Sequence, residues 1–413
     1  MAGAGVLDGV RVLDLTAWQA GPILTMILGD FGAEVLKIEA ATRLDGWRGS
    51  AGMLDDGAYE RSPIWLAINR SKRGLSLDLT TPEGRDLFLR LVADADVVVE
   101  NFTARVMAKL GLAYETLRAV NDRLVMISLS GFGASGPWRD FAAFAFPTEQ
   151  VSGLTFLNGR PGGPPLAIGQ SVTDALAGTM GAFAVLAALE RRARSGRGDR
   201  IDHSHIETLT SLNGGELIGT QLSGRDPQRR GNQRPGFEPQ GLFPCLPPER
   251  WVAISCRSDE EWQHLCRVMG RADLAEDATL VDIGGRSAQR TRVHEAVRAW
   301  TRGRAAVAVA ESLQAAGVPA APVAGSEQLM ADEQLWARGF HNLVERREAE
   351  PNFLPGPVVR LCGTPGRITR PAPLFGEHTR EVLAERLGLD EAELDALEAA
   401  GVTSTVPASQ AWR

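Results

Sequence analysis

Val10-Arg11-Val12-Leu13-Asp14-Leu15, near the beginning of the sequence, is rich in aliphatic residues and predicts a β-strand. The segment 20–31 that follows has the pattern of a helix, and Glu34-Val35-Leu36-Lys37-Ile38 predicts a second strand. Two strands joined by a crossover helix form a βαβ unit, in which the strands run parallel. The chain therefore opens with a unit typical of α/β proteins.

The same alternation of strands and helices continues through the first third of the chain. We expect extended structure at 75–79, a helix at 81–93, a strand at 96–100, a helix at 104–120 and a strand at 124–129. Strands that alternate with helices form a parallel sheet covered on both faces, and its ligand binds beyond the carboxyl ends of the strands. The sequence thus predicts an α/β fold with a large Rossmann-like domain.

The sequence changes character at residues 221–239, which are polar and rich in Arg, Gly and Pro. Beyond this segment, residues 242–256 alternate like a hairpin and are followed by helical patterns. We therefore expect a large domain whose N-terminal part is 1–224, a small α+β domain at 225–328, and a C-terminal segment at 329–413 that returns to the large domain.

The charge of the chain points to a small partner rather than to nucleic acid. Its 413 residues include 44 Lys and Arg and 51 Asp and Glu, which gives a formal net charge of −7.

The four cysteines lack metal-ligand spacing and are typical of reduced thiols. We find neither a run of about 18 apolar residues nor a basic N-terminal segment followed by an apolar one. We therefore expect no membrane partner and a cytoplasmic location.

Several common kinds of site have no motif in this sequence. The loop Thr16-Ala17-Trp18-Gln19-Ala20-Gly21-Pro22 lacks GxGxxG, and the chain contains neither GxxxxGK[ST] nor GxSxG. These absences disfavour nicotinamide, ATP and serine-hydrolase chemistry. The stretch Asp202-His203-Ser204-His205 contains an HxH pair, but no acidic or Cys ligand stands at a recognised spacing from it. We interpret the pair as part of a solvated turn or of structural hydrogen bonds and predict no metal site.

Asp174 stands where an irregular stretch rich in Gly and Pro gives way to a long, alanine-rich helical pattern. Gly178, Ala182 and Leu186 follow it at four-residue spacing, so this face of the helix packs closely and leaves the acid in the first turn. The free amides of a first helical turn favour an ionised carboxylate and can also bind an oxyanion. A helix N-cap and a nucleophile are both open interpretations of Asp174.

Short motifs in a constant order resemble the class III coenzyme A transferases, the family of the formyl-CoA and carnitine CoA transferases. The resemblance covers nearly the whole chain. The fold that this resemblance implies has a Rossmann-like domain and a smaller domain in each subunit of an interlocked dimer. The motifs are Leu7–Thr16, Ala20–Pro22, Gly32–Glu39, Asn69–Arg73, Leu77–Leu79, Val99–Phe102, Ser130–Gly133, Asp174–Glu207, Arg230–Asn232, Phe243–Cys245, Ala315–Val323 and Pro373–His378.

The resemblance implies an enzyme in which Asp174 attacks the thioester of an acyl-CoA donor, with succinyl-CoA as a candidate donor. Asp174 would form a mixed anhydride while CoA leaves as the thiolate, and the thiolate would return to give an aspartyl-CoA thioester. A carboxylic acid acceptor would then take the CoA. Coenzyme A enters as part of a substrate, and the family chemistry implies no permanently bound cofactor and no metal.

The resemblance also assigns residues to CoA binding. Two departures from formyl-CoA transferase stand in this set, because Ala40 and Thr80 replace basic residues of that enzyme. We expect Arg43, Lys72 and Arg73 to supply the missing positive charge for the phosphates. The expected CoA-binding residues are Gln19, Ala20, Arg43, Lys72, Arg73, Leu77, Asp78, Leu79, Asn101, Phe102 and Lys109.

Two alternative functions stay open beside CoA transfer. The α-methylacyl-CoA racemases share this fold, but they need a histidine paired with an aspartate, and residues 142–150, where the racemase histidine would lie, contain none. A second alternative is a non-catalytic CoA-binding subunit of a hetero-oligomer.

For the transferase itself the resemblance implies a homodimer of interlocked subunits. Phe144, Phe146 and Phe156 lie in the segment expected to border the acyl pocket, and they favour a medium-sized or aromatic acid.

Overall fold

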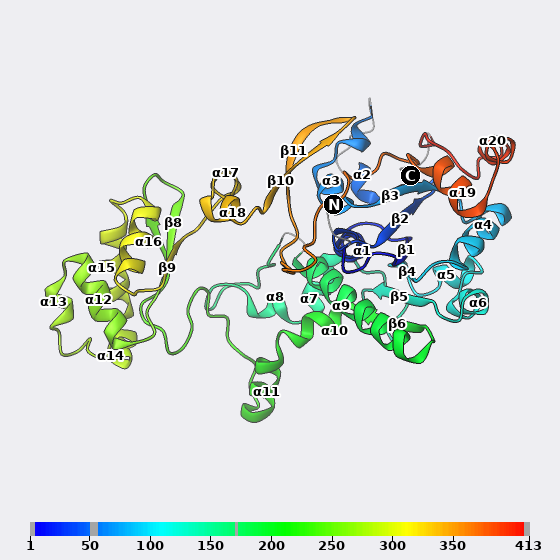
Figure 1. Ribbon diagram of the computed structural model, residues 1–413. Coiled ribbons are helices and arrows are strands. Elements are labelled where there is room, and N and C mark those ends of the chain that lie inside the picture. Colours follow the sequence, from blue (N-terminus) through cyan, green and yellow to red (C-terminus); the bar gives the residue numbers. More distant parts are fainter. Residues whose placement is uncertain (1–4, 50–56, 170–171, 409–413) are drawn as a thin grey trace. The chain divides into compact units, whose positions relative to one another are not determined.

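The computed structural model describes residues 5–49, 57–169 and 172–408 (Figure 1). The described chain forms two compact units, each of which contains more than one stretch of sequence. Whether these units are independent domains with the boundaries expected above stays a prediction. The first unit holds the chain up to Thr155, Ala167–Asp226 and the chain from Gln334 onward, and the second holds Phe156–Leu166 and Pro227–Glu333.

A six-stranded parallel sheet forms the centre of the first unit. Its strand order is β3-β2-β1-β4-β5-β6, and each neighbouring pair of strands is parallel. The sheet confirms the predicted α/β fold. The strands are β1 (Arg11–Asp14), β2 (Glu34–Glu39), β3 (Arg73–Ser76), β4 (Val97–Glu100), β5 (Val125–Ser130) and β6 (Asp199–Ser204).

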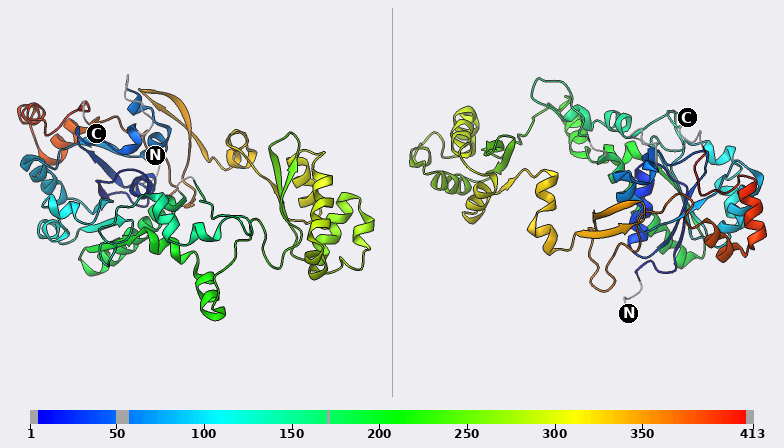
Figure 2. Two further views of the ribbon diagram at one scale, coloured as in Figure 1. Left: turned by 180° about the vertical axis from the view of Figure 1, so that it is seen from behind. Right: turned by 90° about the horizontal axis from the view of Figure 1, so that it is seen from above.

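Helices cover both faces of this sheet, as the views from behind and above show (Figure 2). Successive strand residues point to opposite faces, so Val12 and Leu13 of β1 belong to different hydrophobic cores. The core around Val12 includes Leu24 and Val185, and the core around Leu13 includes Phe88. The first face carries α1 (Ala20–Asp30) and α9 (Val172–Ser195), and the second carries α4 (Pro82–Val92), α6 (Tyr114–Val120), α19 (Thr379–Leu387) and α20 (Glu391–Ala399).

Shorter elements connect the layers. An antiparallel hairpin, β10 (His341–Arg346) and β11 (Ala349–Pro355), was not expected from the sequence. The other short elements are α2 (Gly46–Gly49), η1 (Ala58–Glu60), α3 (Pro63–Ile68), α5 (Val106–Lys109), α7 (Ala145–Val151), α8 (Leu154–Leu157), α10 (His205–Ser211), α11 (Gly214–Ser223) and α18 (Glu333–Ala337).

The single helix expected at 104–120 is wrong, because two helices occupy this stretch. α5 ends at Lys109 and α6 begins at Tyr114. Gly111 lies between them with φ of +72°, a conformation that favours glycine and ends a helix. The third strand begins at Arg73 rather than at residue 75, and the sixth strand was not expected.

The second unit is a small α+β structure. Its antiparallel sheet has the order β7-β8-β9, and its core surrounds the buried Trp262. The expected hairpin at 242–256 corresponds to β7 and β8. The elements are β7 (Gln240–Cys245), β8 (Arg250–Ser255), α12 (Asp259–Met269), α13 (Ala272–Ala275), α14 (Ile283–Ala288), α15 (Arg290–Thr301), α16 (Ala306–Ala315), β9 (Ala320–Pro322) and α17 (Ser326–Met330).

Two glycines allow α9 to pack closely against its neighbours. A Cβ atom added to Gly178 would lie 2.4 Å from the carbonyl oxygen of Ala20, and one added to Gly181 would lie 2.7 Å from Leu24 Cδ1. Among the described helices α9 alone has the length and composition of a membrane span, and this is weak evidence because core helices of soluble proteins share both features. Its contacts with α1 and the sheet are those of a core helix.

We predict that Gly178→Ala lowers the free energy of unfolding by about 1–3 kcal/mol, because the new methyl group overlaps the backbone of Ala20. This loss exceeds the helix propensity that alanine adds, about 0.5–1 kcal/mol. Urea denaturation would measure it. Gly303→Ala is the matched control, since a Cβ there meets no atom within 4 Å. A Gly178→Ala protein as stable as the wild type would show that the close approach is not needed.

Candidate active site

A cavity of about 680 Å³ lies at the carboxyl ends of the strands of the first unit. Loops after β1, β2, β3, β4 and β5 line it, together with Asp174 and His205. This position is the one expected for the ligand of a parallel sheet. Its volume lies in the range of small-molecule and cofactor sites.

A buried group of charges holds the first of these loops. Asp14, the last residue of β1, lies 3.1 Å from Lys72 Nζ and also accepts hydrogen bonds from Thr16. Lys37 Nζ donates to the carbonyl oxygen of Thr16 and lies 3.1 Å from Asp45. Burial alone would raise the pKa of Asp14, but Lys37 and Lys72 lower it to about 2. Asp14 is therefore ionised and binds the loop to the sheet.

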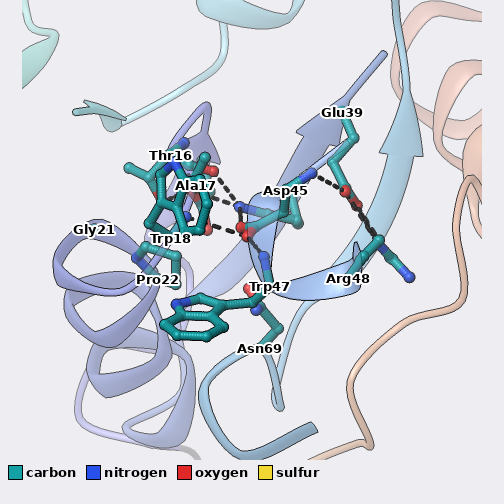
Figure 3. Close-up of polar contacts among 12 residues, drawn as sticks. Thr16, Ala17, Trp18, Gly21, Pro22, Glu39, Asp45, Trp47, Arg48 and Asn69 are labelled. Carbon is teal, nitrogen blue, oxygen red and sulfur yellow. Dashed lines mark hydrogen bonds and ion pairs between the residues drawn. The ribbon is translucent and has the colours of Figure 1, made fainter. Parts of the chain in front are cut away.

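Asp45 joins the loop after β1 to the loop after β2 (Figure 3). Its Oδ1 atom accepts hydrogen bonds from the backbone amides of Trp18 at 3.1 Å and Trp47 at 2.9 Å. The amide of Asp45 donates to Glu39, which also binds Arg48. Trp18 has φ of +64°, an uncommon conformation for a bulky residue. The hydrogen bond that the Trp18 amide donates to Asp45 helps to hold Trp18 in this conformation at the wall of the cavity.

Asp174 lies in the first turn of α9, and its side chain borders the cavity. The side chain is 14% exposed. Burial raises the pKa of Asp174 to about 6, because the carboxylate loses hydration. A carboxylate in this setting is ionised at neutral pH but poorly solvated. Its burial at the cavity wall differs from the setting of a solvated N-cap.

His205 faces Asp174 from the end of β6. Ser204 ends that strand and caps α10 by accepting from the amide of Glu207, which makes His205 the first residue of α10. Its Nδ1 atom lies 3.8 Å from Asp174 Oδ1. Burial is the main cause that lowers the pKa of His205 to about 4, and His203 adds to the effect. The imidazole is therefore neutral at physiological pH.

The position of His205 corrects our interpretation of the HxH pair as part of a solvated turn. His203 lies in β6, whereas His205 directly follows the last residue of that strand and is buried. His203 contacts Thr208 Oγ1 through Nε2 at 3.1 Å. Residues 199–204 contain one apolar side chain, that of Ile201, so the sequence contained little signal for this strand or for the place of His205 at a carboxyl end of the sheet. The described residues contain no cluster of three or more potential metal ligands.

Most of the expected CoA-binding residues line the cavity. Asn101 does so while its amide group also fixes the first loop, because it accepts from the Ala17 amide and donates to the Ala17 carbonyl group. Asp78 accepts from the amide and the hydroxyl group of Thr80. The expected residues that border the cavity are Gln19, Ala20, Arg43, Leu77, Asp78, Leu79, Asn101 and Phe102.

Three expected basic residues do not border it. Lys72 is fully buried and binds Asp14, Pro22 O and Asn69. Arg73 pairs with glutamates of β2 and α19. Their charges are therefore used within the fold, and we leave both out of the proposed CoA site. Lys109 is exposed on α5, the helix whose Val106 lines the cavity.

Aromatic side chains form part of the cavity wall. The rings of Trp18 and Phe144 meet edge to face, with centroids 5.6 Å apart. Phe146, which we expected beside the acyl group, does not line the cavity and is 64% exposed. Phe156 belongs to the second unit, where Arg229 lies over its ring. Of the three phenylalanines expected beside the acyl group, Phe144 is thus the one that borders the cavity of the first unit.

Comparisons with known proteins cover nearly the whole chain. The sequence model of CoA-transferase family III matches residues 7–379. The chain is 34% identical to the succinyl-CoA–D-citramalate CoA-transferase of Chloroflexus aurantiacus, over 95% of this chain and 97% of that protein. It is 33% identical to the succinate–glutarate CoA-transferase of Agrobacterium fabrum, over 92% and 95% of the two chains.

A solved structure gives the same result for the fold. The crystal structure of a CAIB/BAIF family protein from Brucella suis superimposes with a TM-score of 0.84 and 30% sequence identity, over 93% of this chain and 100% of that chain. The sequence match and the shared architecture confirm the resemblance inferred from the ordered motifs. The chain therefore belongs to CoA-transferase family III, and it is a CoA-transferase whose substrates are CoA thioesters.

Proposed function

We propose that this enzyme moves coenzyme A from an acyl-CoA, with succinyl-CoA as the first candidate donor, to a carboxylic acid acceptor, and that Asp174 is the nucleophile. The observation that carries this proposal is a buried carboxylate with a pKa of about 6 at the wall of a cavity large enough for a cofactor-sized ligand. Both named relatives use succinyl-CoA or succinate in their reactions.

The proposed reaction exchanges one anion for another at each step. An Asp174 oxygen attacks the thioester carbon, the carbon–sulfur bond breaks, and CoA leaves as the thiolate. The thiolate then attacks the Asp174 carbonyl carbon and expels the donor acid as its carboxylate, which leaves an aspartyl-CoA thioester. The acceptor carboxylate then attacks the aspartyl-CoA thioester and expels the CoA thiolate, which gives a mixed anhydride of Asp174 and the acceptor. The thiolate attacks the acceptor's carbonyl carbon in this anhydride and expels the Asp174 carboxylate. An anhydride is about as activated as a thioester, so the sequence needs no ATP.

Coenzyme A would lie along the loops that Asp14, Lys37 and Asp45 hold in place. Arg43 is the basic residue among the described residues that line the cavity, and Lys109 is exposed on a helix that borders it. We assign the phosphates to these two residues in place of Lys72 and Arg73. The acyl group would contact the aromatic wall of Trp18 and Phe144, which supports a medium-sized or aromatic acid as the acceptor.

Racemisation is less compatible with this geometry. A two-base racemase places its acid and its base on opposite sides of the substrate carbon, each within hydrogen-bond reach of the proton, about 2.6–3.2 Å. Asp174 Oδ1 and His205 Nδ1 lie only 3.8 Å apart, so no carbon atom fits between them. A non-catalytic subunit has no need of a nucleophile in a desolvated site, and the raised pKa of Asp174 speaks against this alternative.

We also propose a cytoplasmic enzyme that is a homodimer of interlocked subunits, with a heteromer as the alternative. Met180, Phe183 and Leu186 are exposed and lie three residues apart on one face of α9. Leu222 of α11 is 84% exposed, and that helix has no buried residue. Exposed apolar side chains on α9 and α11 support a protein–protein contact at these two helices.

The first prediction concerns the nucleophile. Asp174→Asn should abolish CoA transfer and keep CoA affinity, because the amide preserves the shape but cannot form an anhydride. A screen of carboxylic acids with succinyl-CoA and acetyl-CoA, read by mass spectrometry of the CoA products, would measure transfer. Hydroxylamine trapping of the wild type should modify a peptide that contains Asp174. Label on another residue, or transfer by the Asn variant at the wild-type rate, would contradict the mechanism.

The second prediction concerns pH. The ionised fraction of Asp174 falls as the pH drops through about 6, so kcat/KM should decrease about tenfold per pH unit below that value and level off above it. Initial rates of succinyl-CoA consumption between pH 5 and 8 would show this limb. A rate that stays constant across the range would mean that no group with a pKa near 6 must be ionised.

The third prediction concerns assembly. Light scattering at micromolar concentration should give the mass of a dimer for the wild type. Phe183→Glu and Leu222→Glu should each shift the population to monomers, because a buried unpaired charge opposes association. Circular dichroism would confirm that the variants are folded. A monomeric wild type would refute the homodimer.

A further inference from the structure

The contact between His205 and Asp174 has no role in the reaction derived so far. Asp174 comes from the first turn of α9, and His205 comes from the junction of β6 and α10, 31 positions later in the sequence. Both side chains border the same cavity. His205 Nε2 is buried and has no hydrogen-bond partner among the described residues. The polar contact of this imidazole is therefore the one that Nδ1 makes with Asp174.

The chemistry of the pair decides which nitrogen carries the proton. A carboxylate accepts hydrogen bonds and donates none, so the nitrogen that faces Asp174 must be the N–H donor. In a neutral imidazole the proton then lies on Nδ1, and Nε2 is the free acceptor. An acceptor nitrogen without a partner is less costly in a buried site than an orphaned N–H donor. The tautomer that serves Asp174 is therefore also the one that suits the apolar surroundings of Nε2.

We propose that His205 is a positioning residue for the nucleophile, which donates a hydrogen bond from Nδ1 to Asp174 Oδ1 throughout the reaction. The present separation of 3.8 Å is too long for this bond, and catalytic hydrogen bonds of free enzymes often shorten when the substrate binds. Oδ1 would then be held, and Oδ2 would be the atom that attacks the thioester. This inference rests on the proposed role of Asp174.

The same bond would act again after Asp174 has been acylated. When the CoA thiolate attacks the Asp174 carbonyl carbon, a carbon–sulfur bond forms and the electron pair of the C=O bond moves onto Oδ1. His205 would donate to this oxyanion, and the pair would return when the carboxylate of the donor acid leaves. No proton is transferred in either step. A neutral imidazole that stays unprotonated on Nε2 fits this task, because the reaction needs a fixed N–H dipole and no acid or base.

The titratable groups of α7 and β6 that are nearest in the chain are bound elsewhere. On α7, Glu149 accepts from Thr155 Oγ1 at 2.8 Å and from the amide of Ile168 at 2.7 Å. On β6, Asp202 accepts from the amide of Ala134, and His203 contacts Thr208. Burial is the cause of the raised pKa of Asp174. His205 is therefore the group whose hydrogen bond would favour the ionised carboxylate.

A degenerate exchange reaction tests this role without knowledge of the natural acceptor. Isotopically labelled succinate is incubated with succinyl-CoA, and mass spectrometry follows the label into succinyl-CoA. His205→Leu removes the donor, whereas His205→Asn retains an N–H group near the position of Nδ1. We expect the Leu variant to exchange at least about 100-fold more slowly at saturating substrate, with little change in KM, and the Asn variant to recover most of the rate.

The pH profile separates this role from a purely structural one. Without its donor the Asp174 carboxylate is harder to ionise, so the acidic limb of the Leu variant should lie at a higher pH than the acidic limb of the wild type. The control is His203→Leu, which alters the neighbouring imidazole that makes no contact with Asp174 and should keep the wild-type limb. Binding of CoA, measured by calorimetry, would show that each variant is folded.

The outcomes distinguish this inference from the proposed function. A wild type that is labelled at Asp174, together with a folded Leu variant of unchanged rate and pH profile, would overturn the role of His205 alone. A wild type without label at Asp174 would overturn the nucleophile and with it the inference. If the Leu variant does not fold, the Asn variant decides, because a folded Asn protein that has lost about 100-fold in rate would contradict rescue by an N–H donor.

Discussion

The cavity depends on the buried ion pairs that the Asp14 carboxylate forms with two lysines. This carboxylate lies at the carboxyl end of β1 between Lys37 and Lys72, and all three side chains are fully buried. Removal of one partner from such a group leaves an unpaired buried charge, which typically costs about 3–5 kcal/mol. Lys37 extends the group to Asp45, and Asp45 holds the backbone of Trp18. The loops after β1 and β2 are thus fixed before any ligand binds, which lowers the entropy that these loops lose on binding.

Burial produces two different results in one fold. Asp14 is buried beside two ammonium groups and keeps its charge at low pH, so it serves the structure. Asp174 is buried without a cationic partner, and its pKa rises to about 6, so its ionised form is poorly stabilised. His205 is neutral for the same physical reason, because burial lowers its pKa to about 4. The site therefore holds a desolvated carboxylate beside a neutral imidazole, and the proposed exchange of anions rests on this pair.

Much of the first unit could be predicted from local patterns. The apolar runs at 10–15 and 34–38 correspond to β1 and β2, because neighbouring residues of a parallel strand are buried on both faces of the sheet. The single helix predicted at 104–120 is wrong. The prediction followed the helix propensity of the whole segment, but Gly111 adopts φ of +72° and ends the first of the two helices found there. The sixth strand was not expected because Ile201 is its one apolar residue, so the sequence of this edge strand lacks a hydrophobic pattern even though its residues alternate between half-buried and exposed.

The sequence alone determined the alternation of strands and helices, the family through its ordered motifs, and Asp174 as the residue at the start of a long helix. Only the tertiary structure decided what each charged side chain does. Lys72 and Arg73 follow one another in the chain like a basic patch, yet in the structure Lys72 pairs with Asp14, and Arg73 pairs with three glutamates. His205 reaches Asp174 because β6 pairs with β5 and α9 packs across both strands. Contacts between such distant positions arise from sheet register and helix packing, which local sequence patterns do not encode.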